Sequence, residues 1–322
     1  MSLRTVALIA VVAIGMGCSS SKSSDPPPPA SDGVERLPDM KPAAPSSNGF
    51  QIVLPIVRGV AASGSIEMCS WTDKILDKTI DVKSAAGFQT KTGHHIVVYY
   101  TTKQQPAGTT RECKDEDMAT FRFAIGTGGE GEPALLPGDL VTSIPAGAQI
   151  VVNHHYLNPG LTAVDAQSAV NVELADPSAK YTESGNLAML DTSLRLKPGP
   201  NSMDIHCKMQ KDLKLWQLTP HMHAWGTHIT IDHTKAADSS VARLIDVQWD
   251  PDFTFHPPLT THDPAAPYVL HTGDSVAVHC DFNNTTGSDL TFGLEMCVFF
   301  GQTVDIDNQG SIACDGGQWG TF

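Results

Sequence analysis

Several patterns that would point to common enzyme folds are missing from this sequence. No segment sustains the hydrophobic period of an amphipathic helix, which argues against a helical or α/β architecture. The glycine-rich stretch 126–131 is followed by Glu132 and Pro133 rather than by a helix start, so it does not match a phosphate-binding loop. There is no C-x-x-C pair, which argues against a cysteine-ligated zinc site, and no arrangement typical of a serine or cysteine nucleophile.

Long apolar runs and an excess of basic residues are missing too. The apolar run at residues 6–14 is too short to cross a bilayer, and with Arg4 before it, it is typical of a signal peptide over residues 1–17. Without this leader the chain has 20 basic residues, one fewer than the 21 of the full sequence, against 35 acidic ones. The resulting formal charge of −15 argues against nucleic acid as a partner.

Cys18 follows the predicted leader directly. The sequence after it is rich in Ser, Lys, Asp and Pro, which is typical of a bacterial lipoprotein cysteine, although Gly15 stands where a leucine is usual. Residues 18–48 cannot bury apolar surface, so we expect a lipidated, disordered tether. The sequence therefore predicts an exported protein on the periplasmic or outer side of a bacterial cell envelope, in contact with the membrane only through its lipid.

Six further cysteines, an even number in an exported chain, predict disulfide bonds. They stand at positions 69, 113, 207, 280, 297 and 314. The residues alone leave their pairing open.

Short runs of β-branched and aromatic residues are what the sequence has in quantity. Examples are residues 51–57, 96–100, 120–125, 149–156, 169–174, 227–231 and 275–282. Turn clusters separate them, so we predict an all-β chain built from two antiparallel sandwiches. The body is long enough for two domains, 49–180 and 181–322, with a break in the pattern between Ala175 and Gly185.

His94 and His95 are adjacent, just after Gly93 and just before an apolar strand. Regular pleating would send their side chains to opposite faces, so both can reach one metal only if the backbone is irregular there. A lone pair of this kind is more often one buried and one exposed histidine.

A second pair, His154 and His155, lies in the apolar stretch 151–156. Pleating places these two histidines on opposite faces, with Asn153 beside one and Tyr156 beside the other. One histidine of the pair is therefore favoured as a third ligand. Three imidazoles without a carboxylate suit copper in either oxidation state, and zinc satisfies the same ligands.

His221 and His223 are one residue apart, so on a strand both side chains would emerge from the same face, within reach of one ion. Such spacings are common by chance in a chain with 13 histidines, and a methionine in an apolar strand is more often part of the core. Met296, within Glu-Met-Cys, nevertheless offers a thioether, a soft ligand that stabilises Cu(I) and has little attraction for zinc. These three residues predict a second group of copper ligands.

The segments that hold these residues resemble, in order and context, those of the copper type II, ascorbate-dependent monooxygenases. This is the family of peptidylglycine α-hydroxylating monooxygenase and dopamine β-monooxygenase, and the matching segments are residues 92–100, 151–156, 219–226 and 293–300. The resemblance extends from about Gln51 to the end of the chain. It implies two tandem jelly-roll-like domains that face each other across a cleft.

The resemblance also implies the role of each ligand. The family has its third histidine directly before a tyrosine, which selects His155 and leaves His154 with a structural or surface role. The electron-transfer copper would be held by His94, His95 and His155. The catalytic copper, where O2 is activated, would be held by His221, His223 and Met296.

Two coppers per chain follow from the resemblance, together with ascorbate or another one-electron reductant as co-substrate. The electron donor in a bacterium is left open. The resemblance further narrows the disulfides to three pairs, Cys69–Cys113, Cys207–Cys314 and Cys280–Cys297.

Substrate recognition departs from the family. The peptide-amidating enzyme holds a substrate carboxylate with an arginine where this chain has Thr219, and with an asparagine and a tyrosine where it has Val298 and Phe300. A bidentate carboxylate clamp is therefore lost. Asn153 replaces a glutamine and keeps an amide that could orient a substrate. We expect these four residues to line the site of a small apolar or aromatic substrate.

The predicted function is a copper-dependent monooxygenase that hydroxylates an unactivated C–H bond with O2 and an external reductant. Two other functions fit parts of the pattern. A non-catalytic copper-binding protein of the envelope would use the same six ligands without forming a hydroxylated product. A tethered double sandwich for adhesion or glycan binding would bind no copper tightly.

Overall fold

The computed structural model describes residues 33–118, 120–254, 257–304 and 311–321, so the predicted signal peptide and Cys18 lie outside the described residues. Gly33–Phe322 forms one compact unit. Within the described ranges the helical segments are a single turn, α1 (Asp115–Met118), and a 3-10 turn, η1 (Pro251–Thr254), and neither is long or apolar enough to cross a membrane. The prediction of an all-β chain is confirmed.

We refer to strands β1–β12 as the N-terminal half. Their bounds are β1 Gly49–Val53, β2 Val57–Val60, β3 Gly64–Ile75, β4 Ile80–Gln89, β5 Gly93–Thr101, β6 Thr110–Glu112, β7 Arg122–Gly128, β8 Glu130–Leu135, β9 Leu140–Ile144, β10 Gln149–Asn158, β11 Val164–Ala166 and β12 Ser168–Leu174. Every run expected in this region overlaps one or more of these strands.

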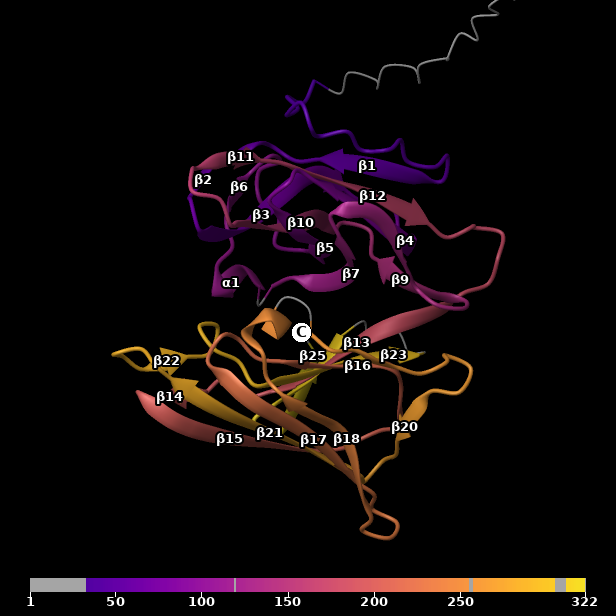
Figure 1. The fold of residues 1–322 in the computed structure, drawn as a ribbon. Helices are drawn as coiled ribbons and strands as arrows, with labels where there is room; N and C mark the ends of the chain where they lie inside the picture. Colours follow the sequence, from indigo (N-terminus) through magenta and orange to yellow (C-terminus); the bar gives the residue numbers. More distant parts are fainter. Residues whose placement is uncertain (1–32, 119, 255–256, 305–310, 322) are drawn as a thin grey trace, which may run out of the picture. The chain divides into compact units, whose positions relative to one another are not determined.

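The N-terminal half is a sandwich of two antiparallel layers. One layer has the strand order β6-β3-β10-β5-β7, and the other contains β1-β12-β4-β9 (Figure 1). Alternate residues of both layers point between them, among them Ile96 and Val98 from β5 and Val170 from β12, all fully buried. Because side chains alternate along a strand, the residues next to these buried ones point to the opposite face of their sheet.

We refer to strands β13–β25 as the C-terminal half. Their bounds are β13 Thr182–Leu190, β14 Arg195–Leu196, β15 Gly199–Lys208, β16 Leu213–His221, β17 Gly226–Thr234, β18 Val241–Gln248, β19 Thr260–Thr261, β20 Tyr268–Leu270, β21 Ser275–Asn284, β22 Leu290–Thr291, β23 Val298–Val304, β24 Ser311–Asp315 and β25 Gln318–Thr321.

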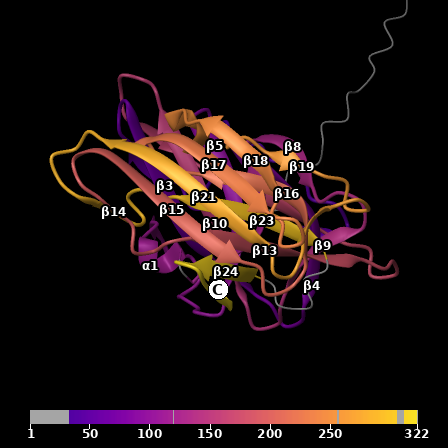
Figure 2. The ribbon, with the colours of Figure 1, turned by 90° about the horizontal axis from the view of Figure 1, so that it is seen from below.

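The C-terminal half is also a sandwich. A four-stranded sheet in the order β15-β21-β17-β18 forms one layer (Figure 2), and β13, β23 and β16 lie side by side in the other. Its core includes Leu215 from β16, Ile229 from β17 and Phe299 from β23, all fully buried. Both expected sandwiches are therefore present.

The two halves share contacts within the compact unit. The start of β13 pairs in parallel with β9, through Thr182 opposite Leu140 and Glu183 opposite Val141. Trp216 of β16 packs into the core of the N-terminal half, and its indole Nε1 donates to Ser184 Oγ at 2.9 Å. Strand pairing otherwise stays within each half, while the division into two domains near residue 180 stays a prediction.

Residues 33–48 lie against the folded body, which corrects the predicted end of the tether at residue 48. Met40 is buried, the Leu37 N–H donates to Gln167 Oε1 at 2.9 Å, and Gln167 Nε2 donates back to the Glu35 carbonyl at 2.7 Å. This contact was not predictable from the sequence, because the fully buried Gln167 lies 130 residues after Leu37.

The described part of the chain holds three disulfide bonds, and all three predicted pairs are confirmed: Cys69–Cys113, Cys207–Cys314 and Cys280–Cys297. Disulfides persist in oxidising surroundings, so the three bonds indicate a protein that works outside the reducing cytosol.

Candidate metal centre

The first histidine group is built on a β-bulge. In the pairing of β10 with β5, His155 stands opposite His95, whereas the next residue, Tyr156, stands opposite Gly93. His94 is the extra residue, and such an insertion bends the strand and re-aims a side chain. The irregularity that the sequence required at this position is therefore present, and both histidines face His155.

One ring nitrogen from each of His94, His95 and His155 lies within 4.8 Å of the other two. The Nδ1 atom of His94 is 3.0 Å from Nδ1 of His95 and 3.2 Å from Nδ1 of His155. Two nitrogens each roughly 2.0–2.1 Å from one metal ion at a tetrahedral angle lie about 3.3 Å apart. These three residues therefore fit a single ion, and imidazole suits copper and zinc alike.

Ser65 on β3 fixes the orientation of the His155 ring. Its Oγ lies 2.7 Å from His155 Nε2, on the far side of the ring from Nδ1. If Nδ1 binds a metal, Nε2 carries the proton and donates it to Ser65 Oγ, which is the usual second contact of a metal-bound histidine.

His154 points to the opposite face, as pleating predicts, and has a structural role. It is fully buried, with Nε2 2.9 Å from Ser70 Oγ and Nδ1 2.8 Å from the Tyr156 hydroxyl. Burial lowers the pKa of His154 to about 3, so the ring stays neutral. The choice of His155 over His154 as the member of the first group agrees with this arrangement.

The second group lies where strands end. His221 is the last residue of β16, and His223 follows it in the loop before β17, so the pair is not on one strand as expected. Their rings are nevertheless close, with centroids 5.1 Å apart. The pKa of His221 is lowered to about 3, mainly by burial and to a smaller extent by the neighbouring His223. Its imidazole therefore stays in the neutral form that a metal requires.

The turn before β23 brings Met296 to this loop. His223 Nδ1 donates to the Leu294 carbonyl at 3.1 Å, so the ring presents Nε2 as its free lone pair. The backbone N–H groups of His223 and Met296 donate to the same oxygen, Oε1 of Glu295, at 2.5 and 2.8 Å. Cys297, the next residue, is tied to β21 through Cys280. Met296 is half-buried.

The four predicted substrate residues differ in exposure. Phe300 is 39% exposed, and its ring centroid lies 5.7 Å from that of His221. Thr219 and Val298 are buried. Asn153 is buried too, and its Nδ2 donates to Glu67 Oε1 at 2.7 Å and to Cys113 Sγ at 3.2 Å, so this amide nitrogen serves the fold rather than an open surface.

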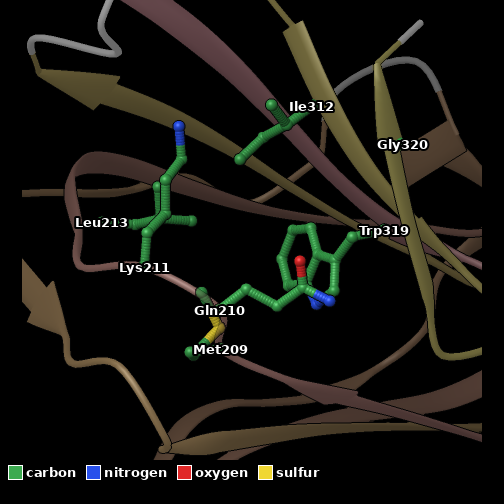
Figure 3. A pocket seen from close by; sticks show the side chains of 7 residues that line it. All are labelled: Met209, Gln210, Lys211, Leu213, Ile312, Trp319 and Gly320. Carbon is green, nitrogen blue, oxygen red and sulfur yellow. The ribbon is translucent and has the colours of Figure 1, made fainter.

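Two cavities accompany these features. One of about 620 Å³ adjoins His94 and is lined also by Phe88, Gln89, Lys91 and Gly129. The other, of about 370 Å³, lies in the C-terminal half, where Figure 3 shows Lys211, Gln210, Trp319 and their neighbours around it. Neither of these two cavities is lined by a residue of the second group.

Comparison with known proteins adds little to this geometry. No family model matches the chain, and no curated protein matches it. Solved structures align only weakly, as three of them illustrate. An atomic structure of the Sulfolobus turreted icosahedral virus aligns with 11% identity over 80% of this chain and 61% of that chain, with a TM-score of 0.22. A structure describing the triple jelly roll fold and turret assembly of an archaeal virus aligns with 9% identity over 84% and 62%, with a TM-score of 0.19.

The third is the PBSX exported protein XepA, with 9% identity over 82% of this chain and 90% of that chain, and a TM-score of 0.21. The chain spans 61% and 62% of the lengths of the two archaeal-virus chains, which is less than two thirds of each. Likenesses at these TM-scores carry no argument about function, and the fold described above rests on the strands themselves.

Two residues of the candidate centre were missed in the sequence. Glu295 stands in a mostly apolar stretch directly before Met296, and a lone acidic residue there is a signal that it contacts something specific. Ser65 gave no signal, because its proximity to His155 depends on the register between β3 and β10.

Proposed function

We propose that this chain is a copper-dependent monooxygenase that hydroxylates a C–H bond of a small apolar or aromatic substrate, using O2 and an external one-electron reductant. The observation that carries the proposal is the convergence of His94, His95 and His155 at separations that suit one ion. The second pair of imidazoles, with a methionine in the adjoining turn, supports a second and chemically softer centre.

The two groups would hold one copper each. When bound, copper at the second group would supply O2 activation, and copper at the first would supply an electron. His155 would keep its Nε2 proton on Ser65 Oγ, and His223 its Nδ1 proton on the Leu294 carbonyl, so that each ring offers its other nitrogen to the metal.

The surroundings of the second group favour an apolar substrate. Phe300 and Leu294 are 39% and 54% exposed, and each adjoins one of the two histidines. Large exposed apolar side chains around a polar centre are typical of a binding surface. The proposal includes export and anchoring at the cell envelope through a lipid on Cys18.

The test is copper stoichiometry, measured with EPR and Cu(I) X-ray absorption on the mature chain, for wild type and Met296→Ile. Met203→Ile is the matched control, since Met203 is also half-buried but lies on β15. We expect two coppers per wild-type chain and a sulfur scatterer that disappears only in Met296→Ile. One copper or none in the wild type would remove the mechanism.

Product analysis separates the enzyme from a non-catalytic copper-binding protein with the same ligands. With a reductant and O2, the enzyme forms hydroxylated product from apolar or aromatic compounds faster than from peptides ending in glycine. Stoichiometric copper binding with reoxidation by O2 and no hydroxylated product would identify the binding protein instead.

A further inference from the structure

Glu295 is a fully buried carboxylate that accepts three backbone hydrogen bonds. Its Oε1 accepts the N–H groups of His223 at 2.5 Å and Met296 at 2.8 Å, and its Oε2 accepts the N–H of Trp225 at 2.9 Å. Burying a carboxylate costs free energy unless hydrogen bonds compensate for it. The three backbone N–H groups supply that compensation, which ties Glu295 to the segments that donate them.

The three donors come from two segments that are far apart in the chain. His223 and Trp225 belong to the loop between β16 and β17, whereas Met296 belongs to the turn before β23, about 70 residues later. Two of the three are proposed copper ligands. One carboxylate therefore fixes the distance between the histidine loop and the methionine turn.

Other contacts hold the same loop but do not replace this link. Trp249 Nε1 donates to the His223 carbonyl at 3.0 Å, and the Asn283 N–H donates to the Trp225 carbonyl at 2.8 Å. Both attach the loop to the four-stranded sheet and its flank. The Cys280–Cys297 disulfide attaches the methionine turn to that sheet. Within the described residues, the hydrogen bonds that join loop and turn directly are those of Glu295 and the one from His223 Nδ1 to the Leu294 carbonyl.

We propose that Glu295 is a positioning residue for the second copper centre, and that it holds His223 and Met296 at the spacing at which both reach one ion. This inference rests on the proposed function, because it needs that centre to bind copper. Glu295 does not itself touch the metal in this role. It acts through the backbone of two ligands, whose side chains would otherwise move apart.

Glu295→Gln isolates this role. The amide has the size of the carboxylate but only one acceptor oxygen, so its NH2 group must face at least one backbone N–H. We expect Glu295→Gln to weaken Cu(I) binding at the second group by tenfold to a hundredfold, the range usual for loss of an outer contact of a metal site. The sulfur scatterer should fall in Cu(I) X-ray absorption, while copper at the first group stays.

Asp274→Asn is the matched control. Asp274 is buried as well and accepts the backbone N–H groups of Ala236 and His271, both at 2.8 Å, in a turn that holds no proposed ligand. We expect this variant to lose stability in urea unfolding but to keep the sulfur scatterer and the Cu(I) affinity. Loss of sulfur scattering in Asp274→Asn to the same extent would overturn the inference, since general destabilisation would then explain both variants.

If Glu295→Gln does not fold, Glu295→Asp tests the same positioning role. It keeps the carboxylate but withdraws it by one methylene, so we expect a smaller loss of Cu(I) affinity in the same direction. If a folded variant at position 295 kept the wild-type Cu(I) affinity and sulfur scattering, the positioning role of Glu295 would be wrong, but the proposed function would stand. A wild-type chain that binds no sulfur-ligated copper would remove the proposed function with it, and the two failures are therefore distinguishable.

Discussion

The two candidate ligand groups differ in what holds their side chains. The first lies on long strands inside a five-stranded sheet, and one inserted residue, His94, brings three imidazoles together. The second lies at the end of β16 and in two turns, which a buried carboxylate and a disulfide hold in place. The difference teaches that sheet register brings the whole first group together, whereas in the second group it places only His221, opposite Val298 at the start of β23, and contacts between a loop and a turn place the other two residues.

The largest expected effect tests the first group through two adjacent histidines. His155→Ala should remove one of two coppers per chain, because His155 is a proposed ligand, and should also lower stability, since the residue is buried and contacts Ser65 Oγ. His154→Ala should keep both coppers and destabilise the fold by roughly 2–4 kcal/mol, since it leaves a cavity and removes one hydrogen bond from each of two buried partners. Copper analysis and urea unfolding of both variants check this. Equal copper loss in the two would contradict the assignment of faces.

Removal of the Cys280–Cys297 disulfide, with alanine at both positions, tests the second group. The bond closes 17 residues and should contribute about 3 kcal/mol of stability by loop entropy. We also expect Cu(I) affinity to fall at the second group alone. The equivalent change at Cys69–Cys113 is the control, because it lies in the other half and should spare sulfur scattering. If both variants kept full affinity, the disulfide would have no part in placing Met296.

Ser65→Ala examines how much the first group depends on a contact outside the sheet register. The change removes the partner of His155 Nε2 and should lower copper affinity at this group by about tenfold, or roughly 1.4 kcal/mol. Chelator competition measures it, with Ser63→Ala, at an exposed neighbouring turn position, as the control. An unchanged affinity would mean that the bulge alone orients the ring.

The smallest expected effect is a change of stability with pH, and it concerns the four-stranded sheet of the C-terminal half. A hydrogen bond to Asp204 raises the pKa of His279, which precedes Cys280 on β21. Protonated His279 therefore stabilises the fold below its unfolded pKa of about 6.5, and this contribution disappears as pH rises through the raised value. Because His279 is partly exposed, the free energy difference between wild type and His279→Gln should stay below about 1 kcal/mol. Urea unfolding from pH 5 to 9 tests this. A difference that grew with pH would reverse the assigned sign.

Strand positions were predictable because alternating apolar residues carry that signal locally. The runs at 96–100, 149–156 and 275–282 fall inside β5, β10 and β21. The opposite orientations of His154 and His155 followed from pleating for the same reason. The need for an irregular backbone at His94 and His95 was also visible, since two adjacent residues cannot share a face of a regular strand.

What could not be predicted depends on contacts between distant segments. The His221–His223 spacing suggested one strand, but β16 ends at His221, and His223 lies in the following loop, where its backbone N–H donates to the distant Glu295. Trp216 could not be assigned to the core of the N-terminal half, because a periodic pattern shows that a residue is buried but not against which partner. The contact of residues 33–48 with Gln167 could not be predicted either, because it joins segments that are far apart in the chain.

The bulge at His94 has a consequence for protein engineering. Without that one residue, β5 and β10 would pair without interruption, and His95 and His155 would remain as an ordinary opposed pair. The close approach of three ring nitrogens in this sheet therefore depends on one inserted residue. Placing one extra histidine in a strand beside an existing opposed pair is a minimal edit that could be transplanted into other antiparallel sheets, where it would create a three-nitrogen site without redesign of the core.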